Sequence, residues 1–251
     1  MTYETLIFEP KGAVATITFN RPDKRNALTV RFFQELMEVL TRIEEDSALR
    51  VVVLAGAGPA FCAGRDFSEA KSADAESAAL YLRLNLEGRE RLRRFPKPVI
   101  ARVHGPASGG GCMLATECAD ISIASRSARF SIREVQAGSV PGQPLFTLGR
   151  ARALGMLLTG DWISGEQAEQ WGMVYRCVSD EELDATVARY AEQLAGQPAT
   201  SMMYTKRAMC FLMDLAGHTQ TEQYLAEVRK LAQQSPDRGA ALTSFLDGTR
   251  R

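Results

Sequence analysis

Apolar residues along this chain follow two spacings, one typical of buried strands and the other of amphipathic helices. Residues 6–9 and 13–19 are short apolar or alternating runs separated by a Lys-Gly pair, which predicts a hairpin. Residues 28–45 carry apolar side chains at helical spacing, and residues 51–55 are entirely apolar. A strand hairpin, a helix and a further strand are therefore expected from the N-terminus.

The same alternation continues through the middle of the chain. The pattern predicts a long helix that ends near Phe95, a strand at 99–103, a helix over about 109–118 and a strand at 120–124. Apolar strands separated by helices need crossover connections, which are typical of a buried and largely parallel sheet. The fold class that follows is α/β.

The composition changes after about residue 198, where helix-forming residues and methionines are frequent. Apolar stripes of this kind are more typical of packing surfaces than of cofactor sites. We therefore expect two regions, a core over residues 1–197 and a C-terminal helical region over residues 198–251.

Composition and charge indicate which kinds of molecule the protein is expected to bind. Thirty basic and thirty acidic residues balance, so the bulk charge carries no signature of nucleic-acid or membrane-surface binding. No stretch approaches the roughly 20 apolar residues of a membrane helix, and no signal peptide is recognised. Five widely spaced cysteines without a Cys-x-x-Cys pair are typical of a reduced, cytoplasmic chain, and the two histidines have no metal-ligand spacing. The expected partner is a small molecule, with no metal, membrane or nucleic acid.

Two glycine-bearing segments, residues 61–67 and 104–113, each follow an apolar strand and lead toward a helix. Glycine lets the main chain approach a ligand closely, and a helix that starts just after Gly110 adds its positive end. A thioester enolate is stabilised by two backbone N–H groups aimed at its oxygen. Together the segments are interpreted as two halves of an oxyanion hole.

These segments and their separation resemble the crotonase superfamily, the enoyl-CoA hydratase/isomerase family. Further matches cover nearly the whole chain and include Asn20-Arg21-Pro22, Asn26-Ala27-Leu28, residues 130–134, Pro141-Gly142 and Leu158-Thr159-Gly160-Asp161. The resemblance implies a crotonase-type spiral of ββα units that holds an acyl-CoA site, followed by a C-terminal helical oligomerisation region. It also implies a homotrimer or a homohexamer, and no cofactor besides the CoA of the substrate.

By the same resemblance, the backbone N–H groups of Arg65 and Gly110 are the oxyanion donors, and Glu134 is the catalytic carboxylate. The family's hydratases carry two glutamates, and Met113 stands where the first of them is found. The positions at which the resemblance implies contacts with substrate or CoA are Lys24, Arg25, Ala27, Ala63, Asp66, Phe67, Gly109, Met113 and Phe245.

The missing glutamate indicates a mechanism. Hydration uses one group to activate water and another to manage the proton at the α-carbon. A single carboxylate can instead remove a proton from one carbon and return it to another while the oxyanion hole holds the dienolate. Double-bond isomerisation by Glu134 is therefore favoured. A hydratase, hydrolase or decarboxylase of the same family is one alternative, and a catalytically weak acyl-CoA-binding protein is another.

Three expectations concern the surroundings of this carboxylate. Leu145 and Phe146 should make its pocket apolar and raise the pKa of Glu134. Glu117 lies one helical turn beyond Met113 and away from the oxyanion end, so a structural ion pair is favoured for it. The arginines between residues 83 and 94 are expected on a solvated helix face.

Overall fold

The computed structural model describes residues 3–141 and 148–247 of the chain. Its strands are β1 (Leu6–Lys11), β2 (Val14–Phe19), β3 (Val51–Gly56), β4 (Val99–Val103), β5 (Pro106–Ser108), β6 (Ile121–Ser125), β7 (Arg129–Ser131), β8 (Ile163–Ser164) and β9 (Arg176–Val178). A larger sheet has the order β1-β2-β3-β4-β6-β9, and a smaller one has the order β5-β7-β8. In the larger sheet β1 and β2 are antiparallel and the other pairs are parallel, as the pattern predicts.

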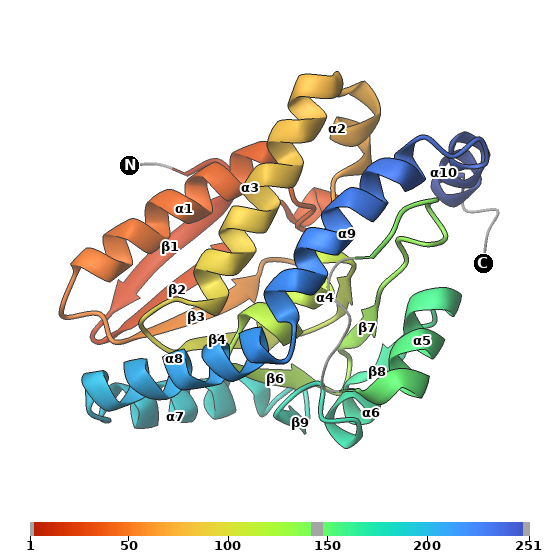
Figure 1. The fold of residues 1–251 in the computed structure, drawn as a ribbon. Coiled ribbons are helices and arrows are strands. Elements are labelled where there is room, and N and C mark those ends of the chain that lie inside the picture. Colours follow the sequence, from red (N-terminus) through yellow and green to blue (C-terminus); the bar gives the residue numbers. More distant parts are fainter. Residues whose placement is uncertain (1–2, 142–147, 248–251) are drawn as a thin grey trace.

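Helices surround the sheets on both sides (Figure 1). They are α1 (Val30–Glu45), α2 (Phe67–Ser72), α3 (Ala75–Arg93), α4 (Gly110–Met113), α5 (Gly149–Thr159), α6 (Gly165–Gln170), α7 (Leu183–Ala195), α8 (Ala199–Leu215), α9 (His218–Gln233) and α10 (Arg238–Leu246). The helix α7 packs against β2, β3, β4 and β6, whereas α1 and α3 pack against each other over the opposite face. Within the described part of the chain, no helix combines the length and the apolar character needed to cross a bilayer.

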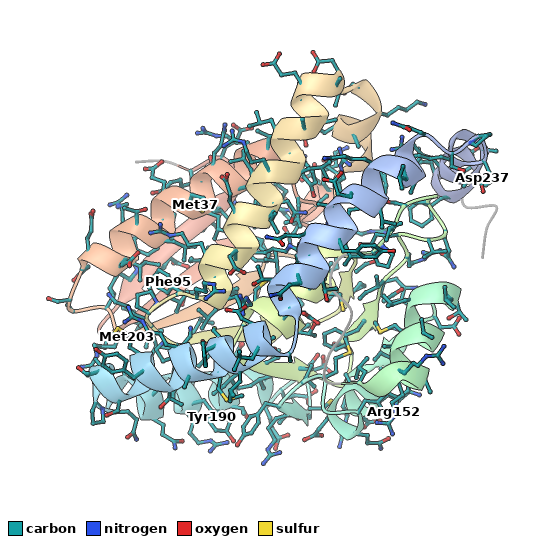
Figure 2. All side chains as sticks on the ribbon, viewed as in Figure 1. Met37, Phe95, Arg152, Tyr190, Met203 and Asp237 are labelled. Atoms are coloured by element: carbon teal, nitrogen blue, oxygen red, sulfur yellow. The ribbon has the colours of Figure 1, made fainter. Side chains whose placement is uncertain are left out.

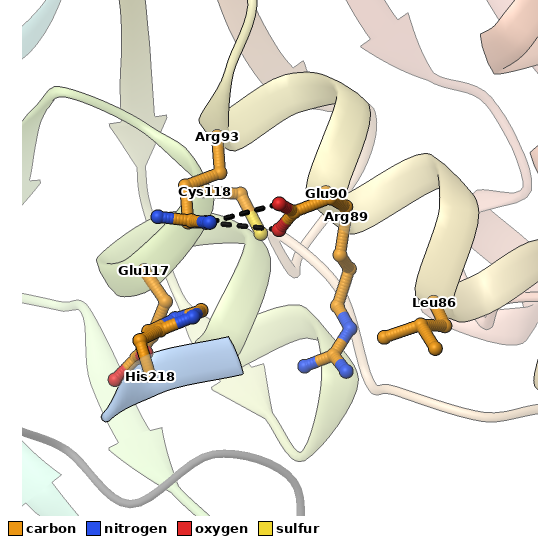
Figure 3. A pocket seen from close by; sticks show the side chains of 7 residues that line it. All are labelled: Leu86, Arg89, Glu90, Arg93, Glu117, Cys118 and His218. Carbon is orange, nitrogen blue, oxygen red and sulfur yellow. Dashed lines mark hydrogen bonds and ion pairs between the residues drawn. The ribbon is translucent and has the colours of Figure 1, made fainter. Parts of the chain in front are cut away.

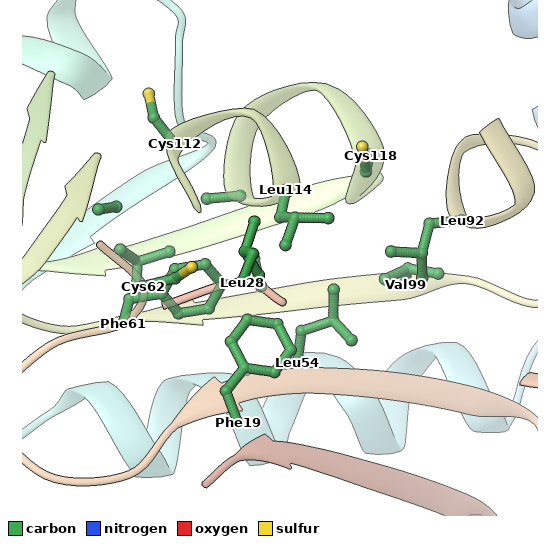
Figure 4. Packing of buried hydrophobic residues seen from close by; sticks show 14 of the residues in the cluster. Phe19, Leu28, Leu54, Phe61, Cys62, Leu92, Val99, Cys112, Leu114 and Cys118 are labelled. Carbon is green, nitrogen blue, oxygen red and sulfur yellow. The ribbon is translucent and has the colours of Figure 1, made fainter. Parts of the chain in front are cut away.

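The strand β3 shows why both faces of the sheet are covered. Val51 and Val53 belong to the core beneath α7, whereas Val52 and Leu54 belong to the larger core beneath α1 and α3. Successive strand residues point to opposite faces, so an all-apolar strand needs cover on both. Figure 4 shows part of the larger core, including Phe19, Leu28, Leu54, Phe61, Leu92 and Leu114.

The side chains complete this layered arrangement. Figure 2 shows Phe95 just past the end of α3, where its side chain is almost fully buried. Asp237 lies at the outer end of the molecule, where α10 begins. The expected division of the chain at residue 198 falls between α7 and α8, and as a domain boundary it stays a prediction.

Two helices differ from the sequence-based expectation. The helix α1 begins two residues later than expected, because Thr29 Oγ1 accepts a hydrogen bond from Phe32 N and caps the helix. The helix expected over residues 109–118 is one turn of α4 followed by a π-helix over Leu114–Cys118, at the end of which Ala119 N donates to Leu114 O. A π-turn holds one more residue than an α-turn, and it changes the direction in which Glu117 points.

Glu35 is a buried carboxylate that joins α1 to the N-terminal segment. Its oxygens accept hydrogen bonds from Glu4 N at 2.8 Å, Thr5 N at 2.8 Å and Thr5 Oγ1 at 2.6 Å. Arg31 Nε lies 2.9 Å away. Burial acts to raise the pKa of Glu35, but these hydrogen bonds outweigh it and leave the pKa below its ordinary value.

We expect Glu35→Ala to lower the free energy of unfolding by about 2 kcal/mol at pH 7, because buried backbone donors lose their acceptor. The pKa of the folded state lies below the unfolded value of 4.5, so the stabilisation is present above pH 4.5 and is lost as the pH falls through the lowered pKa. Urea unfolding at pH 7 and about pH 3 measures both effects. Gln34→Ala, at an exposed position of α1, is the control, and an equal loss in the two variants would contradict the expectation.

Candidate active site

The two glycine-bearing segments lie side by side. On one side of the first segment, Leu28 N donates to Gly64 O at 2.7 Å and Asp66 N donates to Leu28 O at 2.9 Å. On its other side, Ser108 N donates to Cys62 O at 2.9 Å. The first segment is therefore bonded to residues before α1 and to β5, which leads into the second segment.

Glycine is required where the segments meet. A Cβ on Gly64, whose φ is +85°, would lie 2.7 Å from Ser108 O and 3.3 Å from Gly110 N. A Cβ on Gly111 would lie 2.3 Å from Cys62 O. Any side chain at these two positions would push the backbones apart.

The N–H groups of Arg65 and Gly110 are both unused at this junction. Gly64 O and Asp66 N both bond to Leu28, so the Arg65 N–H between them points away from Leu28, toward the side of α4. Gly110 is the first residue of α4, where N–H groups have no partner within the helix. Neither N–H donates to a protein acceptor within residues 3–141 and 148–247. This geometry supports the predicted oxyanion hole.

Glu134 lies beside the same junction. Gly109 N donates to Ser131 O at 2.8 Å, which ties the turn before α4 to the end of β7. A Cβ on Gly109 would lie 2.8 Å from Glu134 Oε1, and the φ of Gly109 is +52°. The carboxylate therefore rests against the backbone next to Gly110.

The surroundings of Glu134 are both buried and charged. Its Oε2 is buried and accepts no hydrogen bond from the described residues. Burial raises the pKa of Glu134, while its own backbone N–H and the charges of Arg89 and Arg229 oppose the rise. The net rise has the direction predicted from the sequence. Leu145 and Phe146, expected to supply the apolar setting, lie outside the described residues.

Arg89 is a residue of this region that sequence analysis missed. It was expected on a solvated face, but it is buried, and its Nη1 lies 3.4 Å from the sulphur of the buried Met113. Its Nη2 lies 3.2 Å from Glu222 Oε2 on α9. The signal that could have found it is its spacing, because it shares a helix face with the apolar Tyr81 and Leu92.

Lys24 and Arg25 lie where the resemblance implies contacts with the CoA phosphates. Both are exposed, at the end of the 3₁₀ turn Pro22–Lys24, and Ala63 N donates to Arg25 O at 2.9 Å. Arg25 and Asn26 have φ values of +50° and +57°, and Asn26 Nδ2 holds this bend by donating to Ala60 O at 2.8 Å. Two solvent-facing cations therefore lie beside the first segment.

Asp66 and Ala27 are engaged by protein groups. Arg21 Nη1 lies 2.9 Å from Asp66 Oδ2 and donates to Ala27 O at 2.7 Å. Asp66 Oδ1 caps α2 by accepting from Ser68 N at 3.0 Å. Burial acts to raise the pKa of Asp66, but bonds from Ser68 and Arg21 hold it below its ordinary value. These contacts hold the backbone of the first segment in its observed conformation. A contact of Asp66 or Ala27 with substrate stays a prediction.

The helix α10 brings Phe245 to the candidate site. Its ring lies 5.2 Å from the ring of Phe67, measured between centroids, and the guanidinium of Arg133 lies 5.1 Å from the Phe245 centroid. The side chain of Arg65 stacks on Tyr81, with 4.3 Å between its guanidinium carbon and the ring centroid. Phe67 and Phe245, two predicted contact residues that are far apart in the sequence, are thus neighbours.

The other candidate groups near the site are thiols. Cys62 and Cys112 are free and buried, and burial raises the pKa of both, to about 12 for Cys62. Such thiols are poor nucleophiles at neutral pH. Among the described residues, no group of three or more His, Cys, Asp or Glu side chains is placed to hold a metal ion.

Glu117 lies beside a small cavity of about 10 Å³ (Figure 3). The cavity is lined by Leu86, Arg89, Glu90, Arg93, Glu117, Cys118 and His218. Burial raises the pKa of Glu117 to about 8, against the charge of Arg89 and with the help of Glu222. The structural ion pair expected for Glu117 is not found within the described part of the chain, where its carboxyl group has neither an ion pair nor a hydrogen bond.

The Glu117 carboxyl group therefore holds its proton at pH 7. Its folded pKa of about 8 exceeds the unfolded value of 4.5, so its contribution to stability is fully present below pH 4.5 and is lost as the pH rises to about 8. The loss is at most about 1.4 kcal/mol for each pH unit. We expect Glu117→Gln to flatten the fall of unfolding free energy between pH 5 and pH 9, as measured by urea unfolding. Glu192→Gln, at an exposed position of α7, should keep the wild-type slope, and equal slopes in all three proteins would refute the shift.

Comparisons with known proteins identify the family of this chain. The sequence model of the family described as Enoyl-CoA hydratase/isomerase matches residues 9–249. The 1,2-epoxyphenylacetyl-CoA isomerase of Escherichia coli strain K12 is 35% identical, over 97% of this chain and 95% of that protein. The short-chain-enoyl-CoA hydratase of Clostridium acetobutylicum is 36% identical, over 83% of this chain and 82% of that protein.

Solved structures show the same relation. The crystal structure of an enoyl-CoA hydratase/isomerase from Xanthobacter autotrophicus Py2 superimposes with a TM-score of 0.90 and 31% identity, covering 99% of this chain and 96% of that one. A probable enoyl-CoA hydratase from Mycobacterium smegmatis gives a TM-score of 0.86 and 31% identity, covering 96% and 98%. The chain therefore has the crotonase fold and belongs to the enoyl-CoA hydratase/isomerase family.

Proposed function

We propose that this protein moves the double bond of an enoyl-CoA thioester and that Glu134 is the group that carries the proton. The observation that supports this most is the junction at Gly109, where one carboxylate rests beside two unused N–H donors. The helix α4 adds no second carboxylate, because Met113 occupies the position of the hydratases' first glutamate. The relative from Escherichia coli is named a 1,2-epoxyphenylacetyl-CoA isomerase, which supports isomerisation of a CoA thioester in general and does not bear on the double bond.

The proposed steps follow from the three groups at the junction. The thioester oxygen accepts hydrogen bonds from the N–H groups of Arg65 and Gly110. The Glu134 carboxylate takes a proton from C2 of a 3-enoyl-CoA, and the electron pair of that C–H bond is delocalised onto the thioester oxygen. The resulting Glu134 carboxylic acid gives the proton to C4, the thioester carbonyl re-forms, and the double bond now lies between C2 and C3. No other reactant is consumed.

Hydration is the second candidate function, and Glu117 is the observation that favours it. This carboxyl group carries a proton at neutral pH and lies beyond Met113, in the π-helix that follows α4. The relative from Clostridium acetobutylicum is named a hydratase. In this scheme Glu134 takes a proton from water as the water oxygen adds to C3, and Glu117 gives the proton that adds to C2. Exchange with solvent then returns Glu134 to its carboxylate form and Glu117 to its acid form.

We further propose that the chain works as a homotrimer or homohexamer. Seven large apolar side chains on the C-terminal helices α8 and α9 are more than half exposed, namely Tyr204, Met209, Phe211, Leu212, Leu215, Tyr224 and Leu231. An exposed apolar surface of this kind is typical of a contact between protein chains. The cytoplasmic location stays a prediction, supported by cysteines that are all free thiols.

We expect Glu134→Gln to lower kcat for isomerisation by about 10²- to 10⁴-fold, because the amide cannot take up the proton. The test is turnover of a panel of 2-enoyl-CoA and 3-enoyl-CoA esters in deuterated water, followed by absorbance and mass. Migration of the double bond without net addition of water should disappear in the variant, together with any deuterium that enters by exchange of the Glu134 proton with solvent. Glu117→Gln is measured in parallel: net water addition by the wild-type protein that is lost in both Glu134→Gln and Glu117→Gln would reject the isomerase and favour the hydratase. Binding of CoA esters without any turnover would reject both.

We expect Gly109→Ala to lower kcat by about 10²-fold, because a Cβ at this position meets Glu134 Oε1 and displaces the carboxylate. The left-handed φ of Gly109 adds strain to the same substitution. Gly155→Ala is the matched control, since a Cβ there meets no atom within 4 Å. Steady-state kinetics and thermal unfolding of both variants separate loss of activity from loss of fold. Full activity in a folded Gly109→Ala protein would show that this turn does not place Glu134.

A further inference from the structure

A cluster of buried charges lies between α3 and α9, which run side by side in Figure 1. Arg89 Nη2 on α3 lies 3.2 Å from Glu222 Oε2 on α9. The other oxygen of Glu222 lies 3.7 Å from Arg229 Nη2, two turns further along α9. Glu222 is 7% exposed, so this carboxylate is held inside the protein. Arg89, Glu222 and Arg229 together form the α9 charge cluster.

The α9 charge cluster reaches the candidate active site in two places. Arg89 Nη1 lies 3.4 Å from the sulphur of Met113, on the helix that presents the Gly110 N–H. Arg89 and Arg229 also both act on Glu134, whose pKa they lower against the effect of burial. Arg229 Nη2 donates to Pro141 O at 3.2 Å, which holds it near the segment that follows Glu134.

Two cations without a balancing charge would make Glu134 a poor proton carrier. A nearby positive charge stabilises the carboxylate form and so weakens its hold on a proton. A group that must take a proton from carbon and give it back works best when its pKa lies near the working pH. The charge that balances Arg89 and Arg229 therefore bears on the chemistry at Glu134.

Other groups around Glu134 do not supply this balance. The titratable or charged side chains that approach Glu134 or the cluster from the packed elements are Cys112 of α4, Glu117 of the π-helix, Arg133, His218 of α9 and Arg238 of α10. Glu117 is uncharged at neutral pH because its pKa is about 8. Burial raises the pKa of Cys112 and lowers that of His218, so both stay uncharged as well. Glu90 lines the same cavity as Arg89, and Asp214 acts on His218, but both of these carboxylates pair with Arg93 and Arg94. The remaining arginines only add positive charge.

We propose that Glu222 is a positioning residue, whose negative charge balances Arg89 and Arg229 and keeps Glu134 able to take up and return a proton. This inference rests on the proposed role of Glu134 as the proton carrier. Glu222 acts on the reaction through the two arginines and needs no contact with the substrate.

The test is the titration of Glu134 in the absence of substrate. Carbon-13 NMR of protein labelled at the glutamate carboxyl groups follows it, and Glu134→Gln identifies its signal. Glu222→Gln keeps the side-chain shape and changes the charge of the cluster from +1 to +2, counting two arginines and one glutamate. We expect the midpoint of Glu134 to fall by about 1 pH unit. The acid limb of kcat/KM should move to lower pH by the same amount.

Opposite charge changes sharpen the test. Arg229→Gln leaves the cluster neutral and should move the midpoint to higher pH. The double variant of Glu222→Gln and Arg229→Gln restores a charge of +1 and should return the midpoint close to the wild-type value. Glu227→Gln, exposed on the same helix and paired with Lys230 at 2.7 Å, should leave it unchanged.

Opposite shifts with restoration in the double variant support the role of Glu222. The proposal is overturned if the titration midpoint of Glu134 stays unchanged in folded Glu222→Gln. It is also overturned if the midpoint moves in the same direction in Glu222→Gln and Arg229→Gln, because a merely structural residue would lower activity without shifting the midpoint in opposite directions. If Glu222→Gln does not fold, the titration midpoints of Glu134 in Arg229→Gln and in the double variant provide the test. The proposal is overturned if the midpoint is not raised in Arg229→Gln and does not return to the wild-type value in the double variant.

The titration also separates this inference from the proposed function. Normal isomerase turnover without midpoint shifts overturns the role of Glu222 alone. Midpoint shifts of the expected sign in a protein that turns over no enoyl-CoA support the control of Glu134 by Glu222 and overturn the isomerisation.

Discussion

The close contact between two backbone segments, at Gly64 on one and Gly110 on the other, is the constraint around which this site is built. The two segments follow the parallel strands β3 and β4. Because neighbouring parallel strands end at the same edge of a sheet, both segments begin at that edge. Hydrogen bonds from Leu28 and Ser108 then hold the first segment in register. Only glycine permits the remaining approach, since a Cβ on Gly64 would meet Ser108 O at 2.7 Å.

The packed layers give that contact its rigidity. A sheet buried on both faces leaves few ways for its strand ends to shift, because each all-apolar strand is fixed by side chains above and below. Asn26 and Arg21 extend the same rigidity into the loop before α1, through bonds to Ala60 O and to Asp66. The N–H groups of Arg65 and Gly110 are thus held in place by the fold itself, as the proposed oxyanion hole requires.

Buried ionisable side chains are the second feature that defines the candidate site. Glu134 and Glu117 both have raised pKa values because burial disfavours their charged forms. Arg89 faces both of them and pairs with Glu222 from a helix more than a hundred residues later in the chain. The C-terminal helices therefore contribute charge to the candidate site.

Local patterns in the chain predict the parallel strands, α1 and the glycine-bearing segments, because hydrophobic period and glycine placement act over a few neighbouring residues. The same patterns identify Glu134, Arg65 and Gly110 as candidates by their resemblance to a family. The π-helix, the strands β7 to β9 of two or three residues, the burial of Arg89 and its pairing with Glu222 are decided by tertiary structure. These features depend on contacts between distant segments, whose energies exceed the weak local preference of each residue, and no local pattern records such contacts.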